Sequence, residues 1–95
     1  MMKTLTGKNA LVTGGTRGIG AASARHLASA GANIAITYSA SADLATALVR
    51  ELEALGVKAH AYHADAAEPA SLPQVVEQVA ADLGGIDILV NNAGT

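Results

Sequence analysis

The feature that most constrains the fold is a run of three glycines, Gly14, Gly18 and Gly20, directly after a short apolar segment that ends at Thr13. Apolar residues then recur three and four positions apart, which predicts a helix over residues 17–30. A strand that turns through glycines into a helix presents free backbone N–H groups and the positive end of the helix dipole. The segment therefore predicts a strand-turn-helix unit that binds a phosphate group.

Each glycine has its own expected role in this turn. Gly14 allows the tight turn, Gly18 lets the backbone approach a phosphate, and Gly20, which has no Cβ, lets the helix pack close to the strand. A cation is unfavourable at a helix N-terminus, so Arg17 favours an anionic ligand there. The alternatives are glycines that only end the two elements and an arginine that is only a solvated charge. The candidate contacts are Gly14, Thr16, Arg17, Gly18, Ile19 and Gly20.

Composition limits the class of protein. A chain of 95 residues suits one domain or part of one, and without Phe or Trp its core must come from Ala, Val, Leu and Ile. The net charge of −2, with both signs scattered, gives no reason to expect nucleic acid or an anionic membrane as a partner. There is no Cys, and no apolar run is long enough for a signal peptide or a membrane span. We therefore expect a cytoplasmic location.

Strand and helix patterns alternate along the whole chain. Strands are predicted over residues 9–13, 33–38, 58–64 and 86–91, the last of them apolar enough to lie centrally in a sheet. Strict alternation implies parallel strands joined by right-handed crossovers, and we expect the strand order 3-2-1-4. The first two helices would then cover one face of the sheet and the third helix the other.

The second helix is expected between Ser41, as its N-cap, and Gly56, just past its end. Its predicted inner stripe comprises Leu44, Leu48, Leu52 and Leu55.

The third helix is expected to open at Ser71, where Ser71-Leu72-Pro73-Gln74 fits a capping box, and to end at Gly84-Gly85. Its predicted inner face comprises Val75, Val76, Val79 and Leu83.

The expected strand order brings two loops together. The loops after the first and fourth strands meet at the topological switch point, where open α/β sheets bind ligands. One loop is the glycine turn, and the other contains Asn91-Asn92-Ala93-Gly94. Asn91 is expected to be structural, with its amide bridging the loop backbones.

Three motifs in this order resemble the short-chain dehydrogenase/reductase family: Thr13-Gly14-x-x-x-Gly18-x-Gly20, Asp65 after the third strand, and Asn91-Asn92-Ala93-Gly94 after the fourth. The branch with larger substrate domains has its last glycine one position later, where this chain has Ala21. The resemblance implies a Rossmann-type doubly wound parallel sheet, truncated, with residues 1–95 as the N-terminal part of the dinucleotide-binding domain. The nearest type is the 3-oxoacyl-carrier-protein reductases.

The resemblance also bears on catalysis. Such enzymes use a Ser and a Tyr-x-x-x-Lys pair on later elements, but the positions four after Tyr38 and Tyr62 hold Ala42 and Ala66. No catalytic residue is therefore assigned in this stretch. The complete protein would be a homo-oligomeric enzyme that transfers hydride between the cofactor and a small carbonyl substrate. The alternative is a non-catalytic nucleotide-binding module or an inactive truncated product.

The end of the second strand indicates the cofactor. An acidic residue there would favour NAD, whereas this chain has Tyr38 and Ser39. In relatives that use NADP, a basic residue in the glycine turn often faces the 2′-phosphate, so Arg17 favours NADP over NAD. By the same resemblance, Asp65 and the Ala66 amide would contact the adenine, although Asp65 could instead be a turn carboxylate. The backbone of Asn92, Ala93 and Gly94 would line the nicotinamide ribose.

The three histidines, His26, His60 and His63, do not predict a metal site. His26 lies on a helix, while His60 and His63 point to opposite faces of one strand, and no Cys or carboxylate cluster completes a ligand set. We expect all three to be surface side chains. Tyr62 is expected to pack at the edge strand rather than to act as an acid.

Overall fold

The sheet is built from four parallel strands in the order β3-β2-β1-β4, as the alternation of elements predicted. The computed structural model describes residues 4–14, 16, 18–64 and 71–92. The elements are β1 (Asn9–Thr13), α1 (Gly18–Ser29), β2 (Asn33–Tyr38), α2 (Ala42–Glu53), β3 (Ala59–His63), α3 (Ser71–Leu83) and β4 (Ile88–Asn91).

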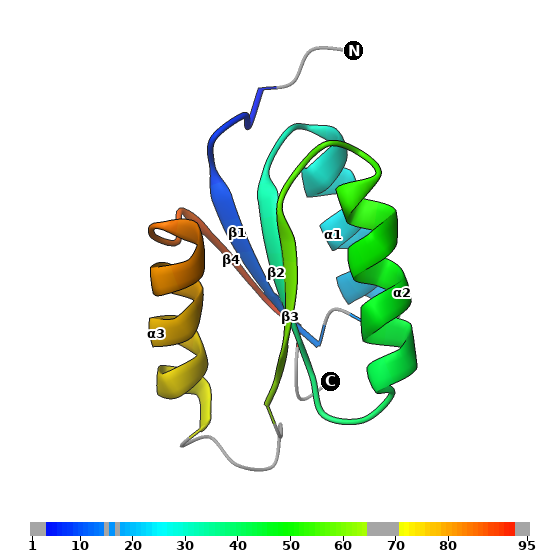
Figure 1. Ribbon diagram of the computed structural model, residues 1–95, viewed down its shortest axis with the longest axis vertical. Coiled ribbons are helices and arrows are strands. Elements are labelled where there is room, and N and C mark those ends of the chain that lie inside the picture. The colour runs from blue at the N-terminus through cyan, green and yellow to red at the C-terminus, as the bar shows by residue number, and fades with distance from the viewer. Residues whose placement is uncertain (1–3, 15, 17, 65–70, 93–95) are drawn as a thin grey trace.

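The helices cover both faces of the sheet. Helices α1 and α2 lie on one face and α3 lies on the other (Figure 1). Alternate residues of β1 point to opposite faces of the sheet. Ala10 and Val12 belong to the core under α1 and α2. Leu11 packs with Val75 and Val79 of α3. Because both faces are covered, every residue of β1 is buried.

Small side chains set the distance between α1 and the sheet. The buried residues of this helix are Gly20, Ala21, Ala24 and Ala28. An alanine face lets the helix axis approach the strands closely, at the cost of a smaller apolar area per residue. The larger side chains of this layer, Ile34, Ile36 and Leu52, come from β2 and α2.

The predicted inner stripe of α2 is half right. Leu48 and Leu52 are buried, but Leu44 is 47% exposed and Leu55 is 40% exposed. Ala45 occupies the buried position instead, because α2 turns a slightly different face toward β2 and β3.

The start of α2 also differs from the prediction. Ser41 does precede the helix, but its backbone is left-handed, with φ 64° and ψ 47°, and its side chain makes no capping hydrogen bond. The Ser41 carbonyl instead accepts the N–H groups of Leu44 and Ala45. A capping side chain requires an extended backbone at its own position, and Ser41 lacks one.

Helix α3 begins at Ser71, as predicted. The side chain of Ser71 lies outside what the structure describes, so the capping box stays a prediction. Val75 and Val79 are buried as expected and Leu83 is partly buried, but Val76 is 38% exposed. Glycines end the helix as predicted, since Gly84 and Gly85 both have positive φ.

Two strands are shorter than their patterns predicted. Strand β4 begins at Ile88 rather than at residue 86, and it forms an edge of the described sheet with alternate rather than continuous burial. Strand β3 spans five residues instead of seven. Within the described part of the chain, no helix combines the length and apolar character needed to cross a membrane.

Candidate functional site

The glycine turn joins the carboxyl end of β1 to the amino end of α1. Gly14 has φ 65° and Gly18 has φ 60°, a region that side chains rarely adopt. Because α1 begins at Gly18, the N–H groups of its first turn have no acceptor within the helix. A Cβ added to Gly18 would meet no atom within 4 Å, so the turn borders open space. Helix N–H groups without an intrahelical acceptor, beside open space, fit an anionic group such as a diphosphate.

Gly20 permits a close approach of α1 to the end of β1, as predicted. A Cβ at this position would lie 2.3 Å from the carbonyl oxygen of Gly14, the residue that follows β1, and 2.9 Å from Asn92 Nδ2. The residue after β4 is thus a further close neighbour, which the sequence did not indicate. At Gly20, α1 therefore lies against both the glycine turn after β1 and the residue that follows β4.

The hydroxyl of Thr13 connects β1 to the end of β4. It accepts the Asn92 backbone N–H at 2.9 Å, and it donates to Asn91 Oδ1 at 3.0 Å, with the Val90 carbonyl at 3.4 Å. The amide of Asn92 donates to the Gly14 carbonyl at 3.4 Å. Asn91 is thus structural, as expected, but its partner is a hydroxyl. The amide that reaches the loop backbone belongs to Asn92.

A second threonine holds the turn from the other neighbouring strand. The Gly14 backbone N–H donates to Thr37 Oγ1 at 3.0 Å, and Thr37 is only 4% exposed. Sequence reasoning did not select Thr37. The available signal was its place near the carboxyl end of an otherwise apolar buried strand, where a hydroxyl needs a polar partner.

The end of β2 lies beside the end of β3. Tyr38 pairs with His63 in the sheet register, and their rings meet edge to face with centroids 5.5 Å apart. His63 Nε2 lies 3.1 Å from the Ser39 carbonyl oxygen. A carbonyl can only accept, so Nε2 carries the proton. His63 is exposed, as expected, but it is tied to the two residues chosen from the sequence as the cofactor-selecting end of β2.

The structure brings part of the candidate set together at this edge of the sheet. Gly14, Gly18 and Gly20 form the turn with the half-buried Thr16, and Asn92 closes it from β4. Ile19 is 74% exposed, so a large apolar side chain stands beside the open turn. The other candidates lie outside the described residues: Arg17, Asp65, Ala66, Ala93 and Gly94.

Tyr62 is not poised as a proton donor. Its hydroxyl donates to Asp82 Oδ2 at 2.6 Å and so joins β3 to α3. Partial burial, that hydrogen bond and the Asp82 charge raise the pKa of Tyr62 above its ordinary value. A catalytic tyrosine needs the opposite shift, toward neutral pH. Among the described residues, no group of three His, Asp or Glu side chains could hold a metal ion.

The whole of residues 8–95 matches the family model of the short chain dehydrogenases. The chain therefore belongs to the short-chain dehydrogenase/reductase family, a family of oxidoreductases, as the three motifs indicated.

Named relatives within the family have different substrates. The chain is 44% identical over 87 residues to a 3-oxoacyl-acyl-carrier-protein reductase of Staphylococcus epidermidis, covering 92% of this chain and 36% of the relative. It is 43% identical over 93 residues to an NAD(P)-dependent L-rhamnose 1-dehydrogenase of a Sphingomonas species, covering 98% of this chain and 37% of the relative. The chain thus spans just over a third of the length of these enzymes.

Solved structures share the same fold closely. A short-chain dehydrogenase from Burkholderia cenocepacia in complex with NADP superposes with a TM-score of 0.93 at 56% identity, over 97% of this chain and 38% of that one. A blue fluorescent protein from a metagenomic library, in complex with NADPH, gives a TM-score of 0.92 at 56% identity, over 97% of this chain and 38% of that one.

Proposed function

We propose that the gene product is an NADP-dependent oxidoreductase that transfers hydride between the cofactor and a carbonyl or alcohol, with residues 1–95 as the N-terminal part of its dinucleotide-binding domain. The observation that carries this proposal is the glycine turn at the amino end of α1, held between β1, β2 and β4, with open space beside Gly18 and the first N–H groups of the helix. Two similar proteins with solved structures contain NADP or NADPH.

Different parts of the dinucleotide would bind at the ends of different strands. The turn from Gly14 to Gly20, with Thr16 and Ile19, would hold the diphosphate, and Tyr38, Ser39 and Arg17 would face the adenosine ribose and its 2′-phosphate. Asp65 and Ala66 would contact the adenine, and the Asn92, Ala93 and Gly94 backbone the nicotinamide ribose.

Bound NADPH would supply the hydride that reduces a carbonyl carbon, while the carbonyl oxygen takes a proton from an acid. Residues 1–95 have no tyrosine with a lysine four positions later, and the hydroxyl of Tyr62 is held by Asp82. The role of these residues would therefore be to bind and orient the cofactor. We further propose that the complete enzyme is cytoplasmic and homo-oligomeric.

Arg17→Ala tests the choice of cofactor. If Arg17 holds the 2′-phosphate by charge-assisted hydrogen bonds, the variant should lose about 1.5–3 kcal/mol of NADPH binding and much less of NADH binding. Titration of the full-length gene product with both cofactors measures this difference. Equal losses for the two cofactors would remove Arg17 from that role.

The alternative is a nucleotide-binding module without activity. NADPH oxidation by the full-length gene product, over a panel of ketones, separates the two. Turnover that persists through repurification supports the enzyme, whereas tight NADPH binding without turnover supports the module.

A further inference from the structure

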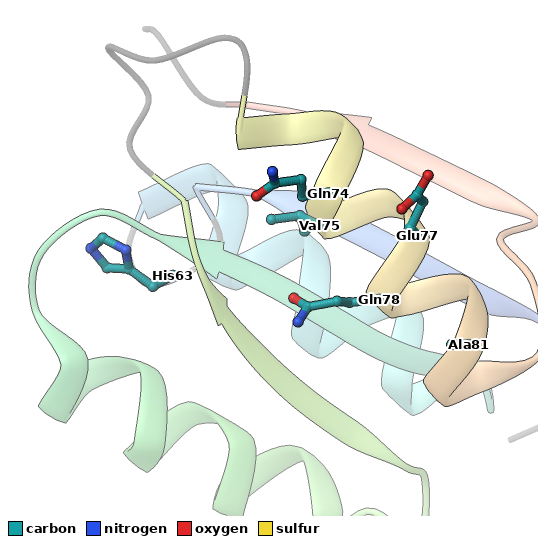
Figure 2. A pocket seen from close by; sticks show the side chains of 6 residues that line it. All are labelled: His63, Gln74, Val75, Glu77, Gln78 and Ala81. Carbon is teal, nitrogen blue, oxygen red and sulfur yellow. The ribbon is translucent and has the colours of Figure 1, made fainter.

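His63 holds one peptide group in the connection between β2 and α2. Its Nε2–H donates to the Ser39 carbonyl at 3.1 Å, and its ring packs edge to face on Tyr38. The ring lies beside a groove of about 440 Å³ between β3 and α3, lined by His63, Gln74, Val75, Glu77, Gln78 and Ala81 (Figure 2). Figure 2 shows the imidazole turned toward the connection after β2 and away from the side chains of α3.

The bond to Ser39 fixes more than one atom. In a planar trans peptide the C=O and the following N–H point in opposite directions. With the Ser39 carbonyl held toward β3, the N–H of Ala40 must point away from β3. The connection then ends at Ser41, whose left-handed backbone is unusual for a residue with a side chain. A connection with this strained residue needs an outside contact to keep one conformation, and His63 provides one.

We infer that His63 is a positioning residue that fixes the Ser39–Ala40 peptide and thereby favours a cofactor with a 2′-phosphate over one with a 2′-hydroxyl. This inference rests on the proposed function, because it takes the end of β2 as the place where the adenosine ribose binds. The held peptide directs one backbone donor and sets the position of the Ser39 side chain. A phosphate uses more donors than a hydroxyl does, so a loosened peptide weakens NADPH more than NADH.

Two substitutions at His63 separate its N–H donor from its bulk. In His63→Gln the side-chain amide places an N–H close to the position of Nε2, whereas His63→Leu fills similar space without a donor. The matched control is His60→Leu, which removes the other, also exposed, histidine of β3. Dissociation constants for NADPH and NADH are measured on the full-length gene product and each variant, together with Arg17→Ala.

For His63→Leu we expect NADPH binding about fivefold weaker and NADH binding nearly unchanged, which corresponds to the loss of one hydrogen bond. His63→Gln should recover most of the lost NADPH affinity, and His60→Leu should match the unsubstituted protein.

Four outcomes overturn the inference. Equal losses of NADPH and NADH in His63→Leu would mean a purely structural role. A loss in His63→Gln as large as in His63→Leu would mean that the N–H donor is not what matters. If the unsubstituted protein does not prefer NADPH, the proposed cofactor fails and this inference with it. If the preference exists and is lost in Arg17→Ala but kept in His63→Leu, the inference fails alone.

Discussion

At the amino end of the sheet, polar side chains bond to one another and to neighbouring backbone, whereas at the carboxyl end they hold the glycine turn that leads into α1. Asn9 is only 8% exposed; its Nδ2 donates to the Leu83 carbonyl, and its Oδ1 accepts Asn33 Nδ2 at 3.0 Å. Its backbone N–H donates to Asp87, and Asn33 accepts the Lys58 N–H. These bonds fasten the starts of all four strands, and they serve the fold alone.

At the carboxyl end, Thr13 and Thr37 are equally buried, but their hydroxyls fix the glycine turn in space. The bonds use the N–H groups of Gly14 and Asn92 and none of the first N–H groups of α1. The comparison therefore predicts that residues at the two ends of the sheet contribute differently to stability and to cofactor binding. Substitutions at the amino end should change the free energy of unfolding alone, and substitutions at the carboxyl end should change both unfolding and cofactor binding.

The largest effect is expected for Gly20→Ala. Its Cβ would overlap the Gly14 carbonyl and crowd Asn92. Moving α1 away should lower the free energy of unfolding by about 2–3 kcal/mol and weaken NADPH binding by about tenfold or more. Thermal unfolding and cofactor titration measure the two effects. Ser29→Ala, on the exposed end of the same helix, is the control, and an unchanged melting temperature in Gly20→Ala would contradict the close approach.

Gly18→Ala and Gly56→Ala form a matched pair, with Gly18 at the carboxyl end of the sheet and Gly56 at the amino end. Both glycines have positive φ, 60° and 93°, and a Cβ at either would meet nothing within 4 Å. Each variant should lose about 1–2 kcal/mol of stability from backbone strain. Only Gly18→Ala should also weaken NADPH binding, by about tenfold, because its methyl group enters the open space beside the turn. Similar affinities in the two variants would place the ligand elsewhere.

Asn33→Ala and Thr37→Val compare the two ends of one strand, β2. Asn33→Ala should lower the free energy of unfolding by about 1–2 kcal/mol without changing NADPH affinity. Thr37→Val keeps the side-chain shape but removes the acceptor of the Gly14 N–H. It should cost about 1 kcal/mol and weaken NADPH binding about threefold. Denaturant unfolding and cofactor titration provide both numbers. Weaker NADPH binding by Asn33→Ala would contradict the expectation that the amino end affects stability alone.

The smallest effect is expected for Tyr62→Phe, which removes a hydrogen bond between β3 and α3 that involves no residue of the glycine turn. It should cost about 0.5 kcal/mol and leave cofactor affinity unchanged. Because the folded protein raises the pKa of Tyr62, the stabilisation is complete below about pH 10 and is lost as pH rises further. Melting temperatures of both proteins should therefore converge above that pH. A constant difference across the range would contradict the role of the Tyr62–Asp82 bond.

The order and type of the elements could be predicted from sequence because each depends on local spacing and on glycines. Gly84 directly follows α3 and Gly56 lies in the turn after α2, both with positive φ, which a sequence pattern signals directly. The exact face of α2 could not be predicted in this way. Ala45 is buried and Leu44 is half-exposed because the orientation of the helix depends on its packing against β2 and β3.

The glycine turn was selected correctly as a structural feature, but the contacts that hold it were not. The hydroxyl of Thr13 bonds to Asn91, 78 residues away, and the backbone of Gly14 bonds to Thr37. Such partners follow from the register between strands and from side-chain orientation, which sequence spacing does not encode. His63 was treated as a surface residue for the same reason, since its contact with Ser39 arises only when β2 and β3 are paired.

The bond between Thr13 and Asn91 also has a consequence during synthesis. At about 5–20 residues per second, a ribosome makes Asn91 roughly 4–16 seconds after Thr13. During that interval β1, α1 and β2 can already associate, and Thr37 can accept the Gly14 N–H. The bonds from Asn92 to Thr13 and Gly14 can form only once β4 has been made. The growing chain therefore makes the glycine turn among its first elements, and translation must continue past β4 before the contacts that complete the turn can form.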